Sequence, residues 1–491
     1  MNRSIEAAET AESAGGPSRP SSLVVVSNRQ PYSHDRTDGE LSVDEPAGGL
    51  TAGLDPVMRT TDGTWIAWGD GDADESVTDE TGRVRVPPDD PSYTLRRLWL
   101  SERDVERYYA GYSNQVLWPV CHGANWKVEH AERYFDRYRD VNERFAEAAV
   151  DTADEDTTVW FQDYHLALAP RRVKEECDAF CMQFWHIPWP GWDGFRRLPQ
   201  REELLDGLLA NDFLAFHLPS YVERFLDCAE SGLDATVDRE AGSVRCRGET
   251  TTVGAFPLGV DAQRRHEQAR SVPNGFWDSF REDHGIGPDE RVAVGVDRLD
   301  YTKGIPERLA ALERLFERHP ERRGRLRYVQ KVAESRTTIP AYRRLGRTVR
   351  DEVARINHRF AVDGWEPIVH LEEYLGEHEL AGLYRHADCA LVSPVCDGMN
   401  LVAQEYVAAQ VDGNGVLVLS ELAGAHELLG EQAVSINPYA TETFADAIEE
   451  ALGMGARERQ ERMDALRRVV FENDLESWMD ELFETAATIR G

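Results

Sequence analysis

Two series of short apolar runs, each alternating with amphipathic stretches, divide this 491-residue chain into similar halves. The first series begins at Leu23 and the second at Val292, with a junction near Pro257 between them. Continuously apolar strands that alternate with helices are typical of parallel sheets covered by helices on both faces. The sequence therefore predicts an α/β fold with two doubly wound, Rossmann-like domains that face each other across a deep cleft.

The apolar runs and the amphipathic periods predict individual elements. The expected strands are Leu23–Ser27, Trp65–Trp68, Leu95–Leu100, Thr158–Gln162, Phe180–His186 and Phe213–Phe216, then Val292–Val296, Leu326–Lys331, Ile368–Leu371, Ala390–Val392 and Val416–Leu419. Helices are expected at Glu202–Ala210, Tyr221–Glu230, Pro306–Arg318, Tyr342–Arg359, Leu380–His386 and Leu401–Gln410. Ligands bind at the carboxyl ends of strands in such folds, so the residues that follow each strand are site candidates.

The same patterns predict the domain boundaries. Residues 1–21 are rich in Ala, Glu, Ser, Gly and Pro, and we expect a disordered tail there. Residues 22–257 form the expected N-terminal domain and residues 258–455 the expected C-terminal domain. We expect residues 456–491 to form a helical segment that packs back on the N-terminal domain.

The charge balance constrains the environment of the protein. The chain has 89 acidic and 55 basic side chains, a net charge of −34, and lysine only at Lys127, Lys174, Lys303 and Lys331. At about 1 M salt the Debye length is ~3 Å, so the repulsion among these carboxylates is screened. We therefore expect a halophilic protein. The same charge argues against nucleic acid or an anionic membrane as a partner.

Localisation and thiol chemistry follow from simple sequence features. No run reaches the ~20 apolar residues of a membrane span. The N-terminus lacks the basic segment followed by an apolar segment that is typical of a signal peptide. We therefore expect a cytoplasmic protein. The seven cysteines are odd in number and show no zinc-ligand spacing, so we expect reduced, mostly buried thiols and no metal site.

A pair of cations stands where the first apolar run of the second half ends. In Val296-Asp297-Arg298-Leu299-Asp300-Tyr301-Thr302-Lys303-Gly304, Arg298 and Lys303 precede the helix expected from Pro306. A helix N-terminus offers free N–H groups and a positive dipole end, and the cations add full charges, so this segment is suited to binding phosphate. Taken alone, an ordinary surface loop with ion pairs is the alternative.

A second turn opens a helix after the run Ala390–Val392. It reads Asp397-Gly398-Met399-Asn400-Leu401-Val402-Ala403-Gln404-Glu405. We expect the N–H groups of residues 399 to 402 to point into the cleft. Glu405, one turn inside the helix, is placed to accept hydrogen bonds from a ribose diol.

In the first half, polar residues follow several expected strands. Arg29 follows the first, and Gly48 and Gly49 stand before a helix, where backbone N–H groups can approach an anion. Asp163 can bind sugar hydroxyls or act as a base, and His186 can donate to a hydroxyl or a phosphate. The alternatives are a plain turn at the glycines and a satisfied core histidine.

The stretch Tyr108–Pro119 is dense in aromatic and amide side chains, including Tyr109 and Trp118. Such groups suit the apolar faces and polar rim of a sugar, although aromatic core packing is the slightly favoured alternative. Arg336, beyond the run Leu326–Lys331, offers one more cation. Together, these segments predict a glycosyl-donor site beside a sugar-phosphate acceptor site.

The motifs resemble, in sequence order, those of trehalose-6-phosphate synthases, which are retaining glycosyltransferases of the GT-B fold. The resemblance runs from about residue 22 to Trp478. The segments that carry it are Val26-Ser27-Asn28-Arg29, Gly48-Gly49-Leu50, Ser113-Asn114-Gln115-Val116-Leu117-Trp118-Pro119, Asp163-Tyr164-His165-Leu166, His186-Ile187-Pro188-Trp189-Pro190, Arg298-Leu299-Asp300-Tyr301-Thr302-Lys303-Gly304 and Asp397-Gly398-Met399-Asn400-Leu401-Val402-Ala403-Gln404-Glu405-Tyr406.

The resemblance implies transfer of glucose from a nucleotide-glucose, with UDP-glucose favoured, to glucose 6-phosphate, giving α,α-trehalose 6-phosphate and a nucleoside diphosphate. It implies acceptor binding by Arg29, Tyr109, Trp118, Asp163 and Arg336 in the N-terminal, acceptor-binding domain. It implies donor binding by Gly48, Gly49, His186, Arg298, Lys303, Asp397, Gly398, Met399, Asn400, Leu401, Val402 and Glu405. The catalytic set that it implies is Asp163, His186, Arg298 and Lys303.

The same resemblance implies a reaction without a metal or another cofactor. Arg298, Lys303 and the helix N-terminus would stabilise the departing diphosphate, and acidic pairs such as Asp70–Asp72 are interpreted as surface groups. No phosphatase motif follows the synthase region, so a separate trehalose-6-phosphate phosphatase is expected. A homo-oligomer is left open.

Three residues depart from the family pattern. Gln162 stands where the family often has His, Gln404 where it often has Lys, and Trp189 where Phe is common. Because glutamine at position 404 removes a positive charge, the preferred base of the donor and the affinity for the donor are left open. The alternatives to the main interpretation are a synthase with another phosphorylated acceptor, such as glycerol 3-phosphate or a cyclitol phosphate, and a non-catalytic sugar-phosphate sensor.

Overall fold

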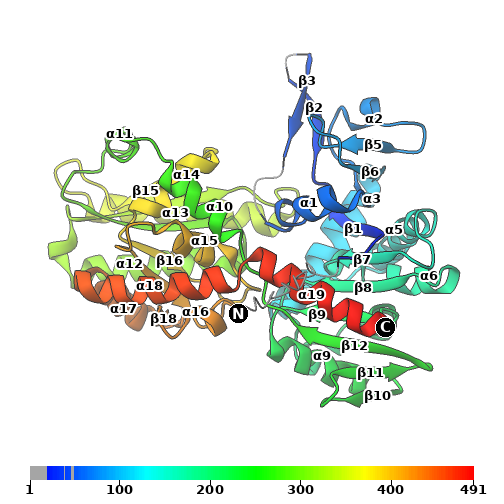
Figure 1. Cartoon of the computed structure of the whole chain (residues 1–491). Helices are drawn as coiled ribbons and strands as arrows, with labels where there is room; N and C mark the ends of the chain where they lie inside the picture. Colours follow the sequence, from blue (N-terminus) through cyan, green and yellow to red (C-terminus); the bar gives the residue numbers. More distant parts are fainter. Residues whose placement is uncertain (1–18, 38, 46–48) are drawn as a thin grey trace, which may run out of the picture.

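The computed structural model describes residues 19–37, 39–45 and 49–491. Two α/β domains face each other, and each contains a sheet between layers of helices (Figure 1). The predicted fold class is therefore confirmed. All of the expected strands and helices are present, with ends that differ from the prediction by a few residues.

The N-terminal sheet has ten strands in the order β10-β11-β12-β9-β8-β7-β1-β4-β6-β5. Its strands are β1 (Leu23–Arg29), β4 (Thr64–Trp68), β5 (Arg83–Val86), β6 (Tyr93–Leu98), β7 (Thr158–Gln162), β8 (Phe180–Trp185), β9 (Phe213–Phe216), β10 (Ala235–Asp238), β11 (Ser243–Cys246) and β12 (Glu249–Ala255). The central strands are parallel, but β5, β10 and β11 pair antiparallel at the two edges. The sequence had predicted a parallel sheet, so these antiparallel edge strands differ from the prediction.

The C-terminal sheet has six parallel strands in the order β15-β14-β13-β16-β17-β18. They are β13 (Arg291–Arg298), β14 (Leu326–Ala333), β15 (Ile368–Leu371), β16 (Cys389–Val392), β17 (Val416–Ser420) and β18 (Val434–Ile436). This is the 3-2-1-4-5-6 order of a dinucleotide-binding fold. Successive strands are added toward one edge from β13 to β15 and toward the other edge from β16 to β18, so the strand order reverses between β13 and β16.

The helices cover both faces of each sheet. In the first half they are α1 (Gly49–Thr61), α2 (Asp74–Val77), α3 (Glu102–Asp104), α4 (Trp118–Cys121), α5 (Glu132–Val150), α6 (Ala169–Glu176), α7 (Trp192–Phe195), α8 (Arg201–Leu208) and α9 (Pro219–Gly232). In the second half they are α10 (Ala262–Arg270), α11 (Phe276–Asp283), α12 (Ile305–Arg318), α13 (Pro340–Phe360), α14 (Glu377–His386), α15 (Leu401–Ala409), α16 (His426–Leu429), α17 (Thr441–Gly453), α18 (Ala456–Glu472) and α19 (Leu475–Arg490).

Two features lie outside this regular pattern. The segment Val105–Leu117 is helical with π-type hydrogen bonds, and the hairpin of β2 (Ser33–Thr37) and β3 (Glu40–Asp44) projects away from the N-terminal half (Figure 1). Among the described residues, no helix is long and apolar enough to cross a membrane. All seven cysteines lie in the described part of the chain as free thiols, five of them buried, which confirms the prediction for them.

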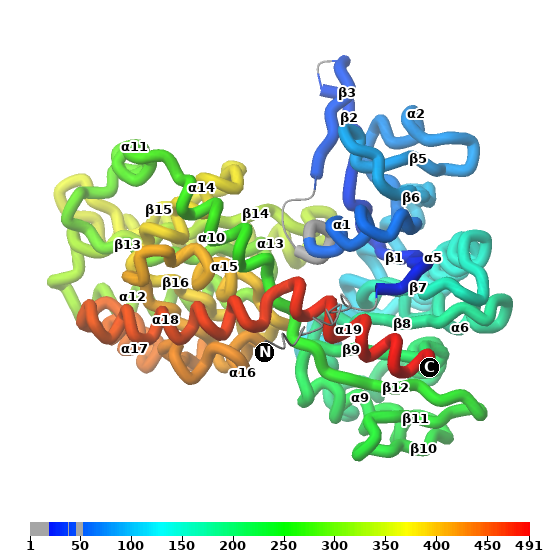
Figure 2. Tube along the Cα trace, in the orientation of Figure 1, coloured from blue at the N-terminus to red at the C-terminus, as the bar shows by residue number. Residues whose placement is uncertain are grey.

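The chain crosses between the halves twice. The first crossing precedes α10 and the second lies between α18 and α19, so that α18 lies on the C-terminal half and α19 runs onto the N-terminal half (Figure 2). There, Trp478 and Phe483 of α19 pack against Trp160 of β7, with ring centroids 5.9 and 5.3 Å apart. Because these side chains are buried, α19 completes the core of the N-terminal half.

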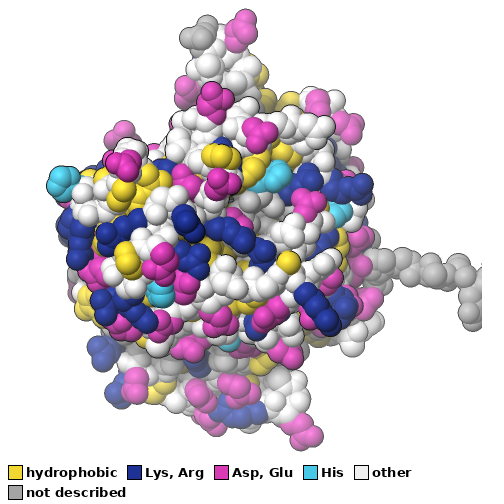
Figure 3. Space-filling view, turned by 90° about the vertical axis from the view of Figure 1, so that its left-hand side faces the viewer, with side chains coloured by type: hydrophobic (Ala, Val, Ile, Leu, Met, Phe, Trp, Pro, Cys, Tyr) yellow, Lys and Arg dark blue, Asp and Glu magenta, His cyan; other side chains and the backbone are white. Residues whose placement is uncertain are grey.

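Acidic and basic side chains are interspersed on the outer face of the C-terminal half (Figure 3). On helices α12 and α13, for example, Arg355 pairs with Glu313 at 2.6 Å and Arg359 pairs with Glu317 at 2.6 Å. Such exposed pairs contribute little individually to stability.

Candidate functional site

Both sheets reverse their strand order at the cleft between the halves. In the C-terminal sheet the reversal lies between β13 and β16, and in the N-terminal sheet it lies between β1 and β7. Loops at the carboxyl ends of such strands diverge and leave a crevice for a ligand. The topology therefore brings the segments after all four strands to one place.

A cavity of about 780 Å³ occupies this place. Its lining residues from the predicted set are Arg29, Tyr109, Trp118, Asp163, His186, Arg298, Lys303, Arg336, Asp397, Gly398, Met399, Asn400, Leu401, Val402 and Glu405. Gly48 lies outside the described residues, and Gly49 is the first residue of α1. The structure thus gathers residues that are more than 370 positions apart in sequence, from Arg29 to Glu405.

The C-terminal wall of the cavity concentrates positive charge. Lys303 donates to Asp397 at 2.5 Å, and Asn400 donates to the same carboxylate at 2.9 Å. Burial favours the neutral form of Asp397, but the Lys303 ammonium outweighs it and lowers the pKa of this carboxyl. Arg298 is exposed to the cavity and forms no ion pair with any described residue. This wall can bind an anion.

The turn before α15 brings the halves into contact. A Cβ atom at Gly398 would lie 2.6 Å from the carbonyl oxygen of His186 in the other half, so only glycine fits there. Asn400, the N-cap residue of α15, has a φ of 51°, a conformation that asparagine tolerates better than most residues. The first N–H groups of α15 therefore lie beside the cavity.

Arg336 connects the two halves at the opposite end of the cavity. It is 6% exposed, pairs with Asp300 at 3.0 Å and lies over the Trp118 ring at 3.9 Å from its centroid. It also donates to the hydroxyls of Tyr342 and Tyr164, at 2.7 and 3.3 Å. The C-terminal half thus contributes a cation to the aromatic wall formed by the N-terminal half.

Arg29 provides the second cation at this end. Its guanidinium donates to Asp70 at 2.6 Å and to the Tyr109 hydroxyl at 3.2 Å, and it lies over the rings of Trp68 and Tyr109. Gln30 also donates to Asp70, at 2.8 Å. Asp70 is an exposed residue, as predicted, and its carboxylate also pairs with Arg29 at the cavity.

The aromatic stretch after residue 105 serves both predicted purposes. Tyr108 and Tyr112 are buried in the core, whereas Tyr109 and Trp118 line the cavity. Successive side chains of a helix point in different directions, so neither interpretation applied to the whole stretch.

Asp163 lies at the end of β7 with a φ of 66°, an unusual value for a residue other than glycine. Its carboxylate accepts the backbone N–H of His186 at 3.1 Å. Burial raises the pKa of Asp163 to about 7, although Arg336 and Arg298 favour ionisation. The cavity therefore holds a carboxyl group that titrates near neutral pH.

We expect the Asp163→Asn variant to be more stable than the parent protein at pH 8 and equally stable at pH 4. The unfolded chain releases this proton near pH 4, whereas the folded chain keeps it to about pH 7. The parent's free energy of unfolding should therefore fall relative to that of the variant between pH 4 and pH 7, then stay level. Urea unfolding at each pH measures this difference, and parallel curves would contradict the prediction.

His186 is neutral in this site. Burial lowers its pKa well below the usual range, and the nearby His217 lowers it further. Its Nε2 lies 3.0 Å from Oε1 of Gln162, one of the residues that depart from the family pattern. Gln162 therefore orients the imidazole rather than contacting a ligand.

The other two departures do not line the cavity themselves. Gln404 is buried and donates to the carbonyl of Leu258 at 3.0 Å, at the crossing between the halves. Because Leu258 lines the cavity, Gln404 supports the cavity wall from behind. Trp189 is fully buried and its indole N–H donates to the Cys228 sulfur at 3.4 Å.

Several lining residues were not among the predicted site residues. His217 directly follows β9, and Tyr374 and Leu375 follow β15, so the rule of strand ends could have found them. Arg265 of α10 carries no such signal, because its place in the cavity depends on how the chain crosses between the halves.

Comparison with known proteins identifies the family. The sequence pattern of glycosyltransferase family 20 matches residues 21–488, nearly the whole chain. The chain belongs to glycosyltransferase family 20. It is 38% identical over 479 residues to the trehalose-6-phosphate synthase of Mycolicibacterium smegmatis, covering 95% of this chain and 92% of the relative.

Solved structures of this family share the fold. A UDP-forming α,α-trehalose-phosphate synthase from Burkholderia vietnamiensis has a TM-score of 0.87 and 32% identity, covering 96% of this chain and 98% of that one. A UDP-forming synthase from Burkholderia xenovorans in complex with glucose 6-phosphate has a TM-score of 0.84 and 30% identity, covering 96% and 100%.

Proposed function

We propose that this family member is an α,α-trehalose-6-phosphate synthase, which transfers glucose from a nucleotide-glucose to glucose 6-phosphate. The observation that carries the proposal is the cavity itself, which has an anion-binding wall and the N-terminus of α15 at one end and two arginines among aromatic rings at the other. UDP-glucose is the proposed donor, because the synthases similar to this chain include UDP-forming enzymes.

In the proposed reaction, the O1 hydroxyl of glucose 6-phosphate attacks the anomeric carbon of the donor on the face that the diphosphate leaves. The bond from that carbon to the diphosphate oxygen breaks, and this oxygen takes the proton of the attacking hydroxyl, so no covalent enzyme intermediate forms. Arg298, Lys303 and the N-terminus of α15 stabilise the departing charge. We propose that they do so without a metal or another cofactor.

At the acceptor end, Arg29 and Arg336 bind the phosphate, while Tyr109 and Trp118 contact the sugar. Arg336 reaches this end from the opposite half, so acceptor binding favours the closed arrangement of the domains. Closure excludes water, which would otherwise hydrolyse the donor. Asp163 binds the acceptor near the reacting hydroxyl.

The deciding experiment supplies glucose 6-phosphate with UDP-, ADP- or GDP-glucose separately, in molar KCl without divalent metal, and identifies the product by NMR. An α,α-1,1-linked disaccharide phosphate supports the proposal and identifies the donor. Turnover with glycerol 3-phosphate or a cyclitol phosphate instead would replace the proposed acceptor. Binding of glucose 6-phosphate without product from any donor would favour the sensor alternative.

We also propose that the protein works in the cytoplasm of a halophile, where a separate phosphatase hydrolyses its product. The net charge of −34 supports the halophilic origin.

We expect the melting temperature to rise by roughly 10 °C between dilute buffer and about 3 M KCl, because salt screens the carboxylates. Sucrose is the control, since it stabilises by exclusion without screening. Equal stability in dilute buffer would contradict the halophile proposal.

A further inference from the structure

Arg265 places a partly buried guanidinium at the donor end of the cavity. It extends from α10, and its Nη2 donates to Oε1 of Glu405 at 2.9 Å. The two side chains are only 17% and 13% exposed. A charge pair this well shielded from water is much stronger than one at the surface.

The contacts of Glu405 leave part of each carboxylate oxygen free. Oε1 accepts from Arg265, and Oε2 accepts from the Tyr384 hydroxyl at 3.4 Å. An ionised carboxylate can accept about four hydrogen bonds, so each oxygen retains capacity for one ligand hydroxyl. The two protein donors therefore fix the orientation of the carboxylate while leaving it able to bind a diol.

The surroundings of Glu405 otherwise disfavour its charge. Burial raises the pKa of Glu405, and the Glu377 carboxylate on α14 raises it further, whereas Arg265 lowers it. Helix α18 also packs against α15, but its Arg467 donates to backbone carbonyls of α15 instead. Among the described residues, Arg265 is thus the cation that neutralises Glu405.

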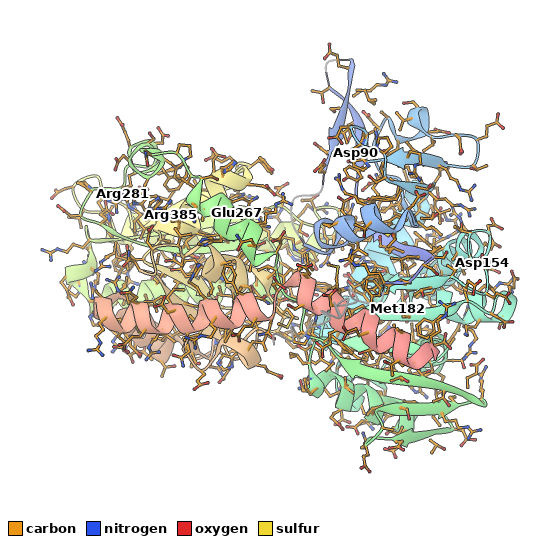
Figure 4. The ribbon with its side chains drawn as sticks, viewed as in Figure 1. Asp90, Asp154, Met182, Glu267, Arg281 and Arg385 are labelled. Atoms are coloured by element: carbon orange, nitrogen blue, oxygen red, sulfur yellow. The ribbon has the colours of Figure 1, made fainter. Side chains whose placement is uncertain are left out.

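Helix α10 is itself anchored where it carries Arg265. Arg264 pairs with Glu377 of α14 at 2.9 Å, and Arg385 of α14 donates to the carbonyl of Ala269 at 2.9 Å. Figure 4 labels Glu267 on α10 and Arg385 on α14, two packed helices of the C-terminal half. The guanidinium of Arg265 is therefore presented to Glu405 from a fixed support.

We propose that Arg265 is a positioning and specificity-determining residue for the nucleoside part of the donor: its ion pair orients the Glu405 carboxylate to accept both ribose hydroxyls. The inference rests on the proposed function, because it requires a nucleoside diphosphate at this end of the cavity. It assigns to α10, the first helix of the C-terminal half, a part in recognising a ribonucleotide.

The test measures dissociation constants by calorimetry for UDP, ADP and GDP, and for the 2′-deoxy form of whichever binds most tightly. In the parent protein, loss of the 2′-hydroxyl should weaken binding roughly tenfold, since a hydrogen bond to a charged group is lost. In Arg265→Met the ribo-to-deoxy ratio should fall below about three, as it should in Glu405→Gln.

Arg270→Met is the matched control, since it removes another arginine of α10, which is exposed and ends the helix outside the cavity lining. It should keep the parent's ratio. Arg265→Gln, which loses the charge but keeps a donor, replaces Arg265→Met if the latter does not fold. An unchanged ratio in both Arg265 variants, or no discrimination by the parent, would overturn the inference while the proposed function stands. No binding of any nucleoside diphosphate by the parent would overturn the proposed function itself.

Discussion

Replacing Lys303 by Met is expected to lower kcat by roughly 10²–10³-fold, the usual effect of removing one preorganised donor that stabilises developing charge. Lys303 contacts Asp397 in a wall that also contains the free guanidinium of Arg298. In the proposed reaction, negative charge grows on the departing diphosphate, so the ammonium contributes more in the transition state than in the ground state. The KM for glucose 6-phosphate should change little, because the acceptor binds at the other end.

The control for this variant is Lys174→Met. Lys174 forms a similar pair with Asp212, at 3.0 Å, outside the residues that line the cavity. Its loss should leave kcat within about twofold. Since Lys303→Met also leaves Asp397 buried without its partner, thermal unfolding of both variants is measured beside the kinetics. A kcat close to the parent's in folded Lys303→Met would show that leaving-group stabilisation does not depend on this lysine.

Replacing Arg336 by Met is expected to raise the KM for glucose 6-phosphate by roughly 100-fold, because hydrogen bonds from a guanidinium to a phosphate contribute about 1.5–3 kcal/mol each. The variant also leaves Asp300, which is fully buried, without its cation. Breaking a buried pair costs about 3–5 kcal/mol, so the single variant should be clearly less stable. Steady-state kinetics and thermal unfolding separate the two effects.

The double variant Arg336→Met/Asp300→Asn removes the unpaired charge and should regain stability while keeping the high KM. Arg343→Met is the surface control, since Arg343 is exposed and, within the described part of the chain, donates only to the carbonyl of Thr337. Glucose, which lacks the phosphate, should react equally poorly with the parent and with Arg336→Met. Recovery of the parent's KM in the double variant would exclude phosphate binding by Arg336.

The parts of the fold that could be predicted are those in which burial determines the pattern. Strand β9 is continuously apolar and buried and was located correctly, because both faces of a parallel sheet are covered. The hairpin β2–β3 and the edge strands β10 and β11 were missed, since their residues are largely exposed or polar. An exposed strand lacks the apolar signal on which the prediction relies.

The candidate site likewise contains contacts that the sequence could predict and contacts that it could not. Asp163 and Asp397 follow strands, so the topology of parallel sheets predicts that they meet. The contact of Asp70 with Arg29 depends on one loop conformation, and that of Arg265 with Glu405 depends on the path between the domains. Sequence patterns describe local periodicity, and neither contact is local.

The position of α19 has a consequence for the order in which the chain can fold during synthesis. Trp478 and Phe483 belong to the core around Trp160, yet they lie more than 300 residues after it in the sequence. At about 5–20 residues per second, the ribosome needs roughly 10–45 s to add the C-terminal half after Pro257. During this interval the first sheet has an uncovered apolar face. The nascent N-terminal half is thus an incomplete domain that must avoid aggregation until α19 emerges.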